Sequence, residues 1–220
     1  MAIEPIALRV PQECLYVRYG TFSNYLWFSD TMDEWGGDLR NLISFRGVDY
    51  GINAKTQTQL AVKQGPLAKL LGPTVIADVA MVGMDTFMRE GASFGILFQA
   101  RNNFALSNDL RGHRADALKA NPDAKEETIE IAGKSVAYLH TPDNRVRSFY
   151  VVDGDYHLVT TSRRLAERFL ETGEKKGRWA TAKNSASHAP KCRYRAAIRS
   201  SRIWATPSFA ICVRPHIASR

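Results

Sequence analysis

The sequence predicts an α+β domain with a largely antiparallel sheet and flanking helices, followed by a non-globular basic tail. Helical and strand-like segments alternate irregularly, without the regular alternation that a doubly wound parallel sheet requires. Two pairs of short strand-like segments are joined by glycine-containing turns, which is typical of hairpins. Acidic residues end at Glu174, where a second type of composition begins.

The first half of the chain combines strands with helices. Residues 14–19 are rich in β-forming side chains and end at Gly20, which predicts a strand. Ser23 or Asn24 is expected to cap the helix that follows, and the paired glycines at 36–37 should interrupt it. Residues 53–71 are predicted to form a second helical stretch, which the Gly-Pro pair at 65–66 interrupts. Two apolar strands are predicted at 74–82 and 93–100.

A further helix and a hairpin come next. Asn102 or Asn103 is the expected cap of a helix that runs to about residue 119. Gly133-Lys134 is expected to join strands at 128–132 and 135–140. The same Gly-Lys-Ser run could suggest a phosphate-binding loop, but such a loop needs a helix after the lysine. A strand is predicted there, so the hairpin is the better interpretation.

The second hairpin has the strongest turn signal of the sequence. Asp153-Gly154 lies between strand-like runs at 147–152 and 155–161, and we expect positive φ at both of its residues. Alternation along the first strand should place Phe149 and Val151 on one face and Tyr150 and Val152 on the other. A last helix, capped by Ser162, should end at Gly173.

Charge divides the chain into a core domain, residues 1–174, and a tail, residues 175–220. The core holds 19 basic and 22 acidic residues, a net charge of −3, whereas the tail holds 11 basic residues and no acidic one. The two values account for the formal net charge of +8. The net positive charge of the whole chain therefore comes from the tail alone. It says nothing about the partners of the core.

The tail has the one signal for nucleic-acid binding. Arginine contacts with phosphates, combined with aromatic stacking on bases, are the usual basis of single-strand binding. The candidate residues for such an interface are Arg178, Trp179, Arg193, Tyr194, Arg195 and Trp204. Nucleic-acid binding through 175–220 is one alternative function, and it is the only one in which nucleic acid is a partner.

The tail is also predicted to be the product of a shifted reading frame. When it is back-translated and read one nucleotide earlier, Trp-Ala forces a glycine codon and Ala-Thr permits aspartate. With a suitable choice of codons, residues 196–208 can then decode as Arg-Asp-Thr-Ile-Phe-Ala-Tyr-Leu-Gly-Asp-Ala-Phe, which would restore acidic residues and has the pattern of a strand ending in a turn. On this hypothesis the tail does not pack on the core, and the core lacks a strand.

Catalytic and metal sites have little support in the sequence. Asp30, Asp33 and Glu34 stand at i, i+3 and i+4, so three carboxylates share one helical face and could hold a hard cation such as Mg²⁺. A solvated helix face gives the same pattern. The histidines and the three cysteines stand at no ligand spacing, and Cys14 fits a small buried apolar residue. We predict no catalytic residue and no cofactor.

Targeting signals are weak as well. No apolar run approaches the ~18 residues that a membrane-spanning helix needs. Glu4 stands where a secretory leader would carry basic residues. Taken as it stands, the chain is expected in the cytoplasm, and in the periplasm or outside the cell if upstream sequence is missing.

Two segments resemble a known protein family. Residues 148–170 (SFYVVDGDYHLVTTSRRLAERFL) and residues 15–42, with Arg18-Tyr19-Gly20 and Trp35-Gly36-Gly37, resemble a module of large bacterial proteins of the planctomycete type. The resemblance covers residues 13–174 and implies an α+β module of an exported protein. It carries no activity, ligand or functional residue over to this chain.

The function expected from these observations is that of a non-catalytic interaction or structural domain of a bacterial protein. Its partner would be a protein or a component of the cell envelope. Nucleic-acid binding through the tail is the first alternative. A metal-dependent enzyme that uses the face of Asp30, Asp33 and Glu34 is the second.

Overall fold

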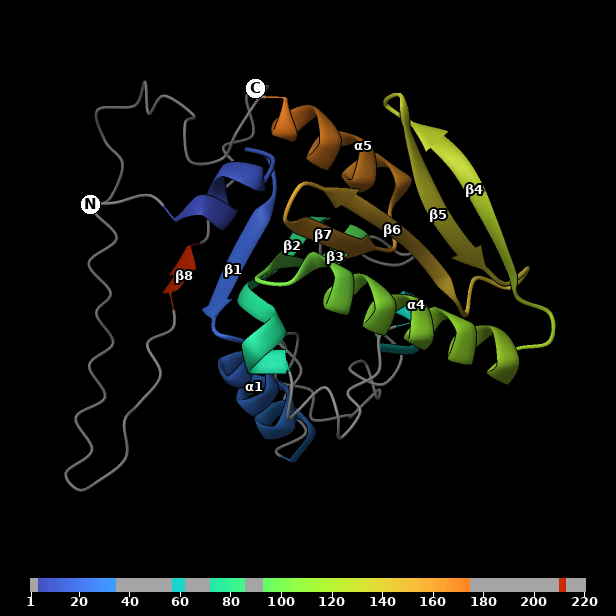
Figure 1. The fold of residues 1–220 in the computed structure, drawn as a ribbon, viewed down its shortest axis with the longest axis horizontal. Coiled ribbons are helices and arrows are strands. Elements are labelled where there is room, and N and C mark those ends of the chain that lie inside the picture. The colour runs from blue at the N-terminus through green and yellow to red at the C-terminus, as the bar shows by residue number, and fades with distance from the viewer. Residues whose placement is uncertain (1–3, 35–56, 62–71, 86–92, 175–209, 213–220) are drawn as a thin grey trace, which may run out of the picture.

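The computed structural model describes residues 4–34, 57–61, 72–85, 93–174 and 210–212 (Figure 1). Within these residues, eight strands form one antiparallel sheet in the order β4-β5-β6-β7-β3-β2-β1-β8. Helices cover the sheet, and the predicted α+β fold class is confirmed. No helix of the described part is long and apolar enough to cross a membrane.

The strands are short, and every pair of neighbours is antiparallel. Their bounds are β1 Leu15–Gly20, β2 Ile76–Asp85, β3 Ser93–Ala100, β4 Lys125–Ile131, β5 Lys134–His140, β6 Arg147–Asp153, β7 Tyr156–Thr160 and β8 Ala210–Cys212. The helical elements are the 3₁₀ helix η1 Pro5–Arg9 and the α-helices α1 Phe22–Glu34, α4 Asn103–Ala120 and α5 Arg163–Gly173. The 3₁₀ helix η1 was not predicted from the sequence.

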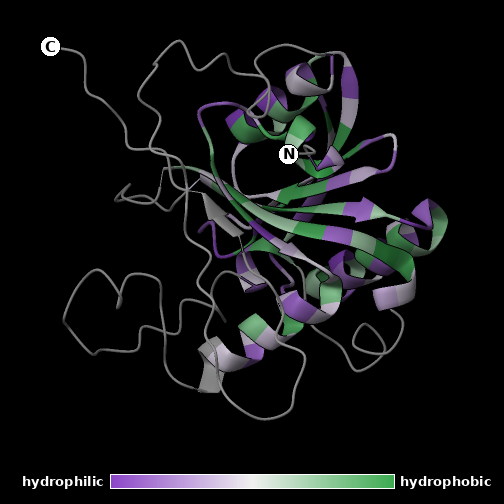
Figure 2. Cartoon of the chain, turned by 90° about the vertical axis from the view of Figure 1, so that its left-hand side faces the viewer, coloured by the Kyte–Doolittle hydropathy of each residue, from purple (hydrophilic) through white to green (hydrophobic). Residues whose placement is uncertain are grey.

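Two large apolar clusters pack on opposite faces of the sheet. One joins η1 and α5 to the strands, through residues such as Ile6, Leu165 and Phe169. The other joins α1 and α4, through residues such as Leu26 and Leu106. Figure 1 shows α5 and α4 on opposite sides of the central strands, and Figure 2 shows apolar residues concentrated along those strands. The burial of both faces explains why the central strands are nearly continuous apolar runs.

The predicted assignment of side chains to faces in β6 is confirmed. Phe149 and Val151 belong to the cluster under α5, whereas Tyr150 belongs to the cluster under α4. The caps of the two later helices are also confirmed. Asn102 Oδ1 accepts a hydrogen bond from Ala105 N at 3.1 Å, and Ser162 Oγ accepts one from Leu165 N at 3.3 Å.

The cap predicted for the first helix is wrong. Thr21 Oγ1 accepts the hydrogen bond of the Asn24 backbone N–H at 3.2 Å, so α1 begins at Phe22, before either predicted cap. Asn24 instead uses its side-chain amide to donate to the carbonyl oxygen of Tyr19 at 2.8 Å. That bond ties the start of α1 to the end of β1, which explains why an asparagine one turn inside the helix is tolerated.

Both hairpin turns differ from the prediction by one residue. In the first, Ile131 pairs with Lys134, so the turn is Ala132-Gly133, with φ of 50° and 73°. Positive φ at both central positions is the geometry of a type I′ turn.

In the second hairpin, Asp153 pairs with Tyr156, and the turn residues are Gly154 and Asp155. Gly154 has a φ of 62°, whereas neither aspartate has a positive φ. The prediction of positive φ at both Asp153 and Gly154 is therefore wrong. A positive φ at the first central position alone is typical of a type II′ turn.

The described part of the tail is β8 alone. Its backbone pairs with β1, with Ile211 opposite Val17. The tail was predicted not to pack on the core, and the backbone pairing of β8 with β1 differs from that prediction for these three residues. The remainder of the tail and the helix interruptions predicted at 36–37 and 65–66 lie outside the described residues.

Candidate interaction surface

The carboxylates predicted as a metal-binding face lie on α1. The backbone of this helix includes Asp30, Asp33 and Glu34, and Asp30 is exposed. The side chains of Asp33 and Glu34 are outside the described part. Among the side chains that are described, no three His, Cys, Asp or Glu residues gather as a metal site. The nucleic-acid candidates of the tail, from Arg178 to Trp204, also lie outside the described residues.

The two edges of the sheet have opposite chemical character. At one edge, β4 carries four charged residues among its seven, namely Lys125, Glu126, Glu127 and Glu130. All four are exposed. Charges along an edge oppose pairing with a further strand, because an added strand would desolvate them. The edge at β4 is therefore protected against strand addition.

The sheet ends on its other side at the three-residue β8, and β1, the strand that β8 partly covers, lacks this protection. Its sequence, LYVRYG, has one charged residue, Arg18. The guanidinium of Arg18 is bound by carboxylates within its own domain, with Nε 2.7 Å from Asp78 Oδ2 and Nη1 3.5 Å from Glu4 Oε1. Tyr16, Val17 and Arg18 pair with β8, which covers three of the six residues of the strand. Within the described residues, β1 thus accepts a strand along half of its length.

Both faces of β1 are packed, which holds its backbone in place. Tyr16 is buried in the cluster under η1 and α5. Tyr19 is 2% exposed on the other face, where its ring contacts Tyr25 edge-on at 5.3 Å between centroids and Phe28 at 5.2 Å. A strand that binds beside β1 would therefore meet a backbone that is already held in place. Folding has already ordered β1, so binding would cost little further conformational entropy in this strand.

Asp78 fixes Arg18 from the neighbouring strand. It is 5% exposed, and burial raises the pKa of its carboxyl group although the Arg18 guanidinium opposes this shift. The paired arginine cannot lose its proton in a protein. Arg18 is therefore held in the sheet, and its charge is balanced within the domain.

The segment before β1 ties that end of the sheet to the hairpin of β6 and β7. Arg9 at the end of η1 forms an ion pair with Asp153, which also binds Lys134. The Arg9 guanidinium lies 4.7 Å from the centroid of the Tyr156 ring, in a cation–π contact. Burial opposes the ionisation of Asp153, but its bonds with Lys134 and Arg9 outweigh burial and lower its pKa. These contacts are structural, and they seat η1 on the sheet.

A buried polar network lies on the sheet face that α1 and α4 cover, and it was not predicted from the sequence. His157 is fully buried, with Nδ1 2.9 Å from the Tyr150 hydroxyl and Nε2 2.9 Å from Asn103 Oδ1. Asn103 Nδ2 donates to Asp155 Oδ1 at 2.6 Å. Because a carboxylate only accepts, Asn103 Oδ1 must accept from His157 Nε2–H, and Nδ1 then accepts the Tyr150 hydroxyl proton.

This network joins α4 to β6 and β7. Burial lowers the pKa of His157 to about 4, so the ring is neutral at neutral pH. Both of its nitrogens are engaged in hydrogen bonds, which leaves none for a substrate. Two of the exposed large apolar side chains, Phe104 and Val152, lie nearby along the chain or across the strand pair. The network is therefore a structural tie between α4 and the β6–β7 pair.

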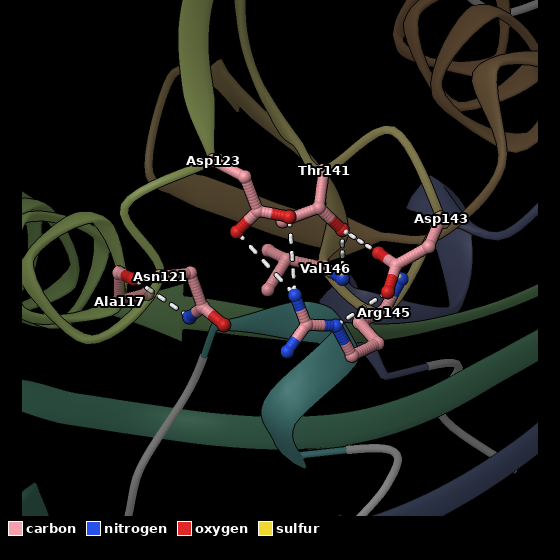
Figure 3. A network of polar contacts seen from close by, with 7 residues as sticks. All are labelled: Ala117, Asn121, Asp123, Thr141, Asp143, Arg145 and Val146. Carbon is pink, nitrogen blue, oxygen red and sulfur yellow. Dashed lines mark hydrogen bonds and ion pairs between the residues drawn. The ribbon is translucent and has the colours of Figure 1, made fainter.

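The long loop between β5 and β6 is held by a surface network (Figure 3). Arg145 binds Asp143 and also reaches Asp123 at 3.1 Å. The Thr141 hydroxyl donates to Asp143 Oδ1 at 2.7 Å, and hydrogen bonds from Thr141 and the Arg145 backbone and side chain lower the pKa of Asp143 to about 2. Thr141 Oγ1 also accepts from Val146 N at 3.1 Å. These contacts hold the loop between β5 and β6 and tie it to Asp123.

Comparison with protein-family models, with curated proteins and with solved structures finds no match to this chain. The resemblance to the planctomycete-type module therefore stays a prediction. The candidate surface has to be judged on its own geometry.

Proposed function

We propose that the core is a non-catalytic interaction or structural module of a bacterial protein, and that it binds its partner by adding a strand to the outer edge of β1. The observation that supports this proposal is the contrast between the two sheet edges. β4 carries four exposed charges, whereas the single charge of β1 is neutralised by Asp78 and Glu4. The partner is a protein or a protein component of the cell envelope.

Strand addition suits this edge physically. An extended segment gains main-chain hydrogen bonds along the acceptor strand, and specificity comes from alternate side chains that meet the two faces. β8 pairs with three residues of β1, a short contact that a longer strand could displace. Because an isolated short strand gains few hydrogen bonds, a six-residue partner should bind β1 more tightly than β8 does.

We also propose that the tail from residue 175 onward is translated in a shifted frame. The support is compositional, since acidic residues fall from 22 in the core to none in 46 positions. When the tail is read one nucleotide earlier, its codons also permit acidic residues and a strand-like pattern. On this proposal the arginine and aromatic pattern of the tail is a by-product of the frame, and nucleic-acid binding is not its function.

Proline substitution tests the role of the β1 edge. Successive N–H groups along a strand point to opposite sides. Of Val17→Pro and Arg18→Pro, one therefore removes an N–H that points away from β2, and the other removes an N–H that points toward β2. The variant that keeps its fold should lose partner binding. Arg18→Ala controls for the lost side chain, and Thr128→Pro with Ile129→Pro are the matched pair on the β4 edge.

The measurement is amide hydrogen exchange of the full chain with and without a partner captured by cross-linking in a bacterial envelope extract. Protection confined to residues 15–20, and lost in the tolerated proline variant, would support the proposal. Protection centred on the apolar rim of Phe104 and Val152 would contradict it. Binding to single-stranded oligonucleotides with a steep dependence on salt would instead favour the tail as the functional surface.

A further inference from the structure

Three basic side chains form a row across β4, β5 and β6. In the strand pairing, His140 is opposite Lys125 on one side and opposite Arg147 on the other. Residues that are directly opposite each other point to the same face of a sheet, so these three share one face. It is the face that carries η1 and α5, because Tyr138, two residues before His140, packs against that apolar cluster. The basic row thus lies just beyond the cluster.

A stack of three aromatic rings leads from the apolar cluster to the basic row. Phe149, which is 3% exposed, stacks on Tyr138 with 4.3 Å between ring centroids, and Tyr138 stacks on His140 at 4.6 Å. The ring planes differ by 14° and 10°. His140 is the outer ring of this stack, and 25% of its side chain is exposed. Its ring is already held in orientation, so a flat ligand ring could stack on it at little cost in entropy.

The carboxylates near the basic row are already engaged. Glu127 Oε1 lies 3.5 Å from Nε2 of His140. In the loop beside the row, Arg145 binds both Asp123 and Asp143. These acidic groups therefore have cationic or polar partners of their own.

The two outer cations of the row have no such partner. Among the described residues, neither Lys125 nor Arg147 forms an ion pair, although Lys125 is exposed and Arg147 is half-buried. Arg147 Nε is buried and has no hydrogen-bond acceptor. Such an unmade bond is unfavourable, so an anion that drew the guanidinium outward would supply an acceptor that the fold lacks.

We infer that the basic row binds a nucleoside monophosphate, with the base on the outer face of His140 and the phosphate on Arg147 and Lys125. A phosphate carries a charge of about −1.5 to −2 at neutral pH, which matches two unpaired cations. An arginine fork can bind it through two parallel N–H groups, one of them Nε–H.

The spacing of the sheet suits this ligand. Neighbouring strands are about 4.8 Å apart, and the phosphate of a nucleotide lies roughly one such spacing from its base. A base over β5 therefore places the phosphate over β4 or β6, where the two cations are. The row is at the opposite end of the sheet from β1, so this inference is independent of strand addition there. The site was not predicted from the sequence, because strand pairing alone brings the three residues together.

The first test follows the ring resonances of His140 in the full 220-residue chain during addition of adenosine 5′-monophosphate. The His140 signal is the histidine signal that is missing in His140→Phe. The nucleotide should shift it to saturation, because a stacked purine adds a ring current. Adenosine and inorganic phosphate each supply half of the ligand and should bind about tenfold more weakly or worse. No shift with the nucleotide, or equal affinity for the nucleotide and phosphate, would overturn the inference.

The second test uses variants and the rise in melting temperature that the nucleotide causes by binding the native state. His140→Phe keeps a flat ring and should keep the rise, whereas His140→Ala should lose most of it. Arg147→Gln should weaken binding about tenfold or more, and Arg111→Gln, an exposed position of α4, should leave it unchanged. If Arg147→Gln does not fold, Lys125→Gln at its exposed position should still weaken binding severalfold. An equal rise in all variants would place the nucleotide elsewhere on the chain and overturn the inference.

Discussion

The Nε2 atom of His157 lies 2.9 Å from Oδ1 of Asn103, and this contact sets the direction of a buried chain of hydrogen bonds. The ring donates from Nε2 and accepts at Nδ1 from Tyr150. The Tyr150 oxygen, 3.3 Å from Ser107 Oγ, is then left to accept the serine proton. Every member of the chain has a partner, so adding a proton to the ring would break an existing bond.

Stability should therefore fall in acid because of His157. Its pKa is about 4 in the folded protein and near 6.5 in an unfolded chain, so the unfolded state takes up the proton first. The contribution is complete above pH ~6.5 and is lost as the pH falls from there to about 4, by roughly 2–4 kcal/mol. Urea unfolding at pH 7 and pH 4.5 measures the loss.

The matched variants isolate this group from the titrating carboxylates. His157→Gln should lower stability at pH 7 but show a smaller drop between the two pH values than the parent. His113→Gln, at a half-buried position of α4 outside this network, should keep the drop that His157 causes. A parent and a His157→Gln variant with the same pH dependence would contradict the prediction.

Gly173 leaves room for the ion pair between Arg9 and Asp153. A Cβ atom at this position would overlap Asp153 Oδ2 and lie 2.6 Å from Arg9 Nη1. Gly173→Ala should gain about 1 kcal/mol of helix propensity and lose a similar amount from the displaced pair. The net change in the free energy of unfolding should therefore be near zero.

A double-mutant cycle separates the two terms. In an Asp153→Ala background, Gly173→Ala should be more favourable than in the parent, because the carboxylate is gone and only the flexible Arg9 side chain has to move. Equal effects of Gly173→Ala in both backgrounds would show that the alanine does not disturb the pair. Chemical denaturation of the four proteins gives the coupling energy directly.

The turn between β4 and β5 places an alanine in the left-handed region. Ala132 has a φ of 50° and is exposed, so its Cβ is strained without contributing to packing. Ala132→Asn, which creates the Asn-Gly pair preferred in type I′ turns, should raise stability by about 0.5–1 kcal/mol. Gly133→Ala, at a φ of 73°, should lower it by at least as much. Stabilisation by Gly133→Ala would contradict the turn geometry.

The sequence predicted those elements whose determinants are local. β3 coincides with the predicted range 93–100, and the caps Asn102 and Ser162 are in place, because a cap depends on neighbouring backbone alone. Turn positions failed because they depend on register. Asp153 belongs to β6 and not to the turn. It binds Lys134 and also Arg9, which is 144 residues away in the sequence.

The buried network was missed for the same reason. His157 and Asn103 are 54 residues apart, and no short spacing announces their contact. The contrast between the sheet edges, too, depends on strand order, because a sequence does not show which strands lie outermost. The charges of β4 were visible in the sequence, but their meaning follows from the position of β4 at the end of the sheet.

The carboxylates of α1 should behave as a solvated helix face. Asp33→Asn combined with Glu34→Gln should leave the free energy of unfolding within about 0.5 kcal/mol of the parent. Mg²⁺ should not raise the melting temperature of either protein, since a cation that bound only the native state would stabilise it. A Mg²⁺-dependent rise in the parent that disappears in the double variant would support the metal-dependent alternative.

Arg114 is a buried cation whose removal should cost less than the removal of its partner. The residue is 3% exposed, with Nε 2.7 Å from Glu126 Oε1 and Nη1 3.0 Å from Ser148 Oγ. Burial lowers its pKa although Glu126 opposes this shift. Glu126→Ala would leave this charge unpaired in the interior and should cost about 2–3 kcal/mol.

Arg114→Met removes the charge but keeps most of the buried side-chain volume, so its cost should stay below that of Glu126→Ala. Two features support this order. Glu126 is 37% exposed and can be solvated when its partner is lost, and the Ser148 hydroxyl still donates to the Leu60 carbonyl oxygen at 2.7 Å. Urea unfolding of both variants checks the order, with Arg114→Ala as the control for lost volume. If Arg114→Met destabilised the protein more than Glu126→Ala, the ion pair would be a net source of stability and this account of the buried charge would be wrong.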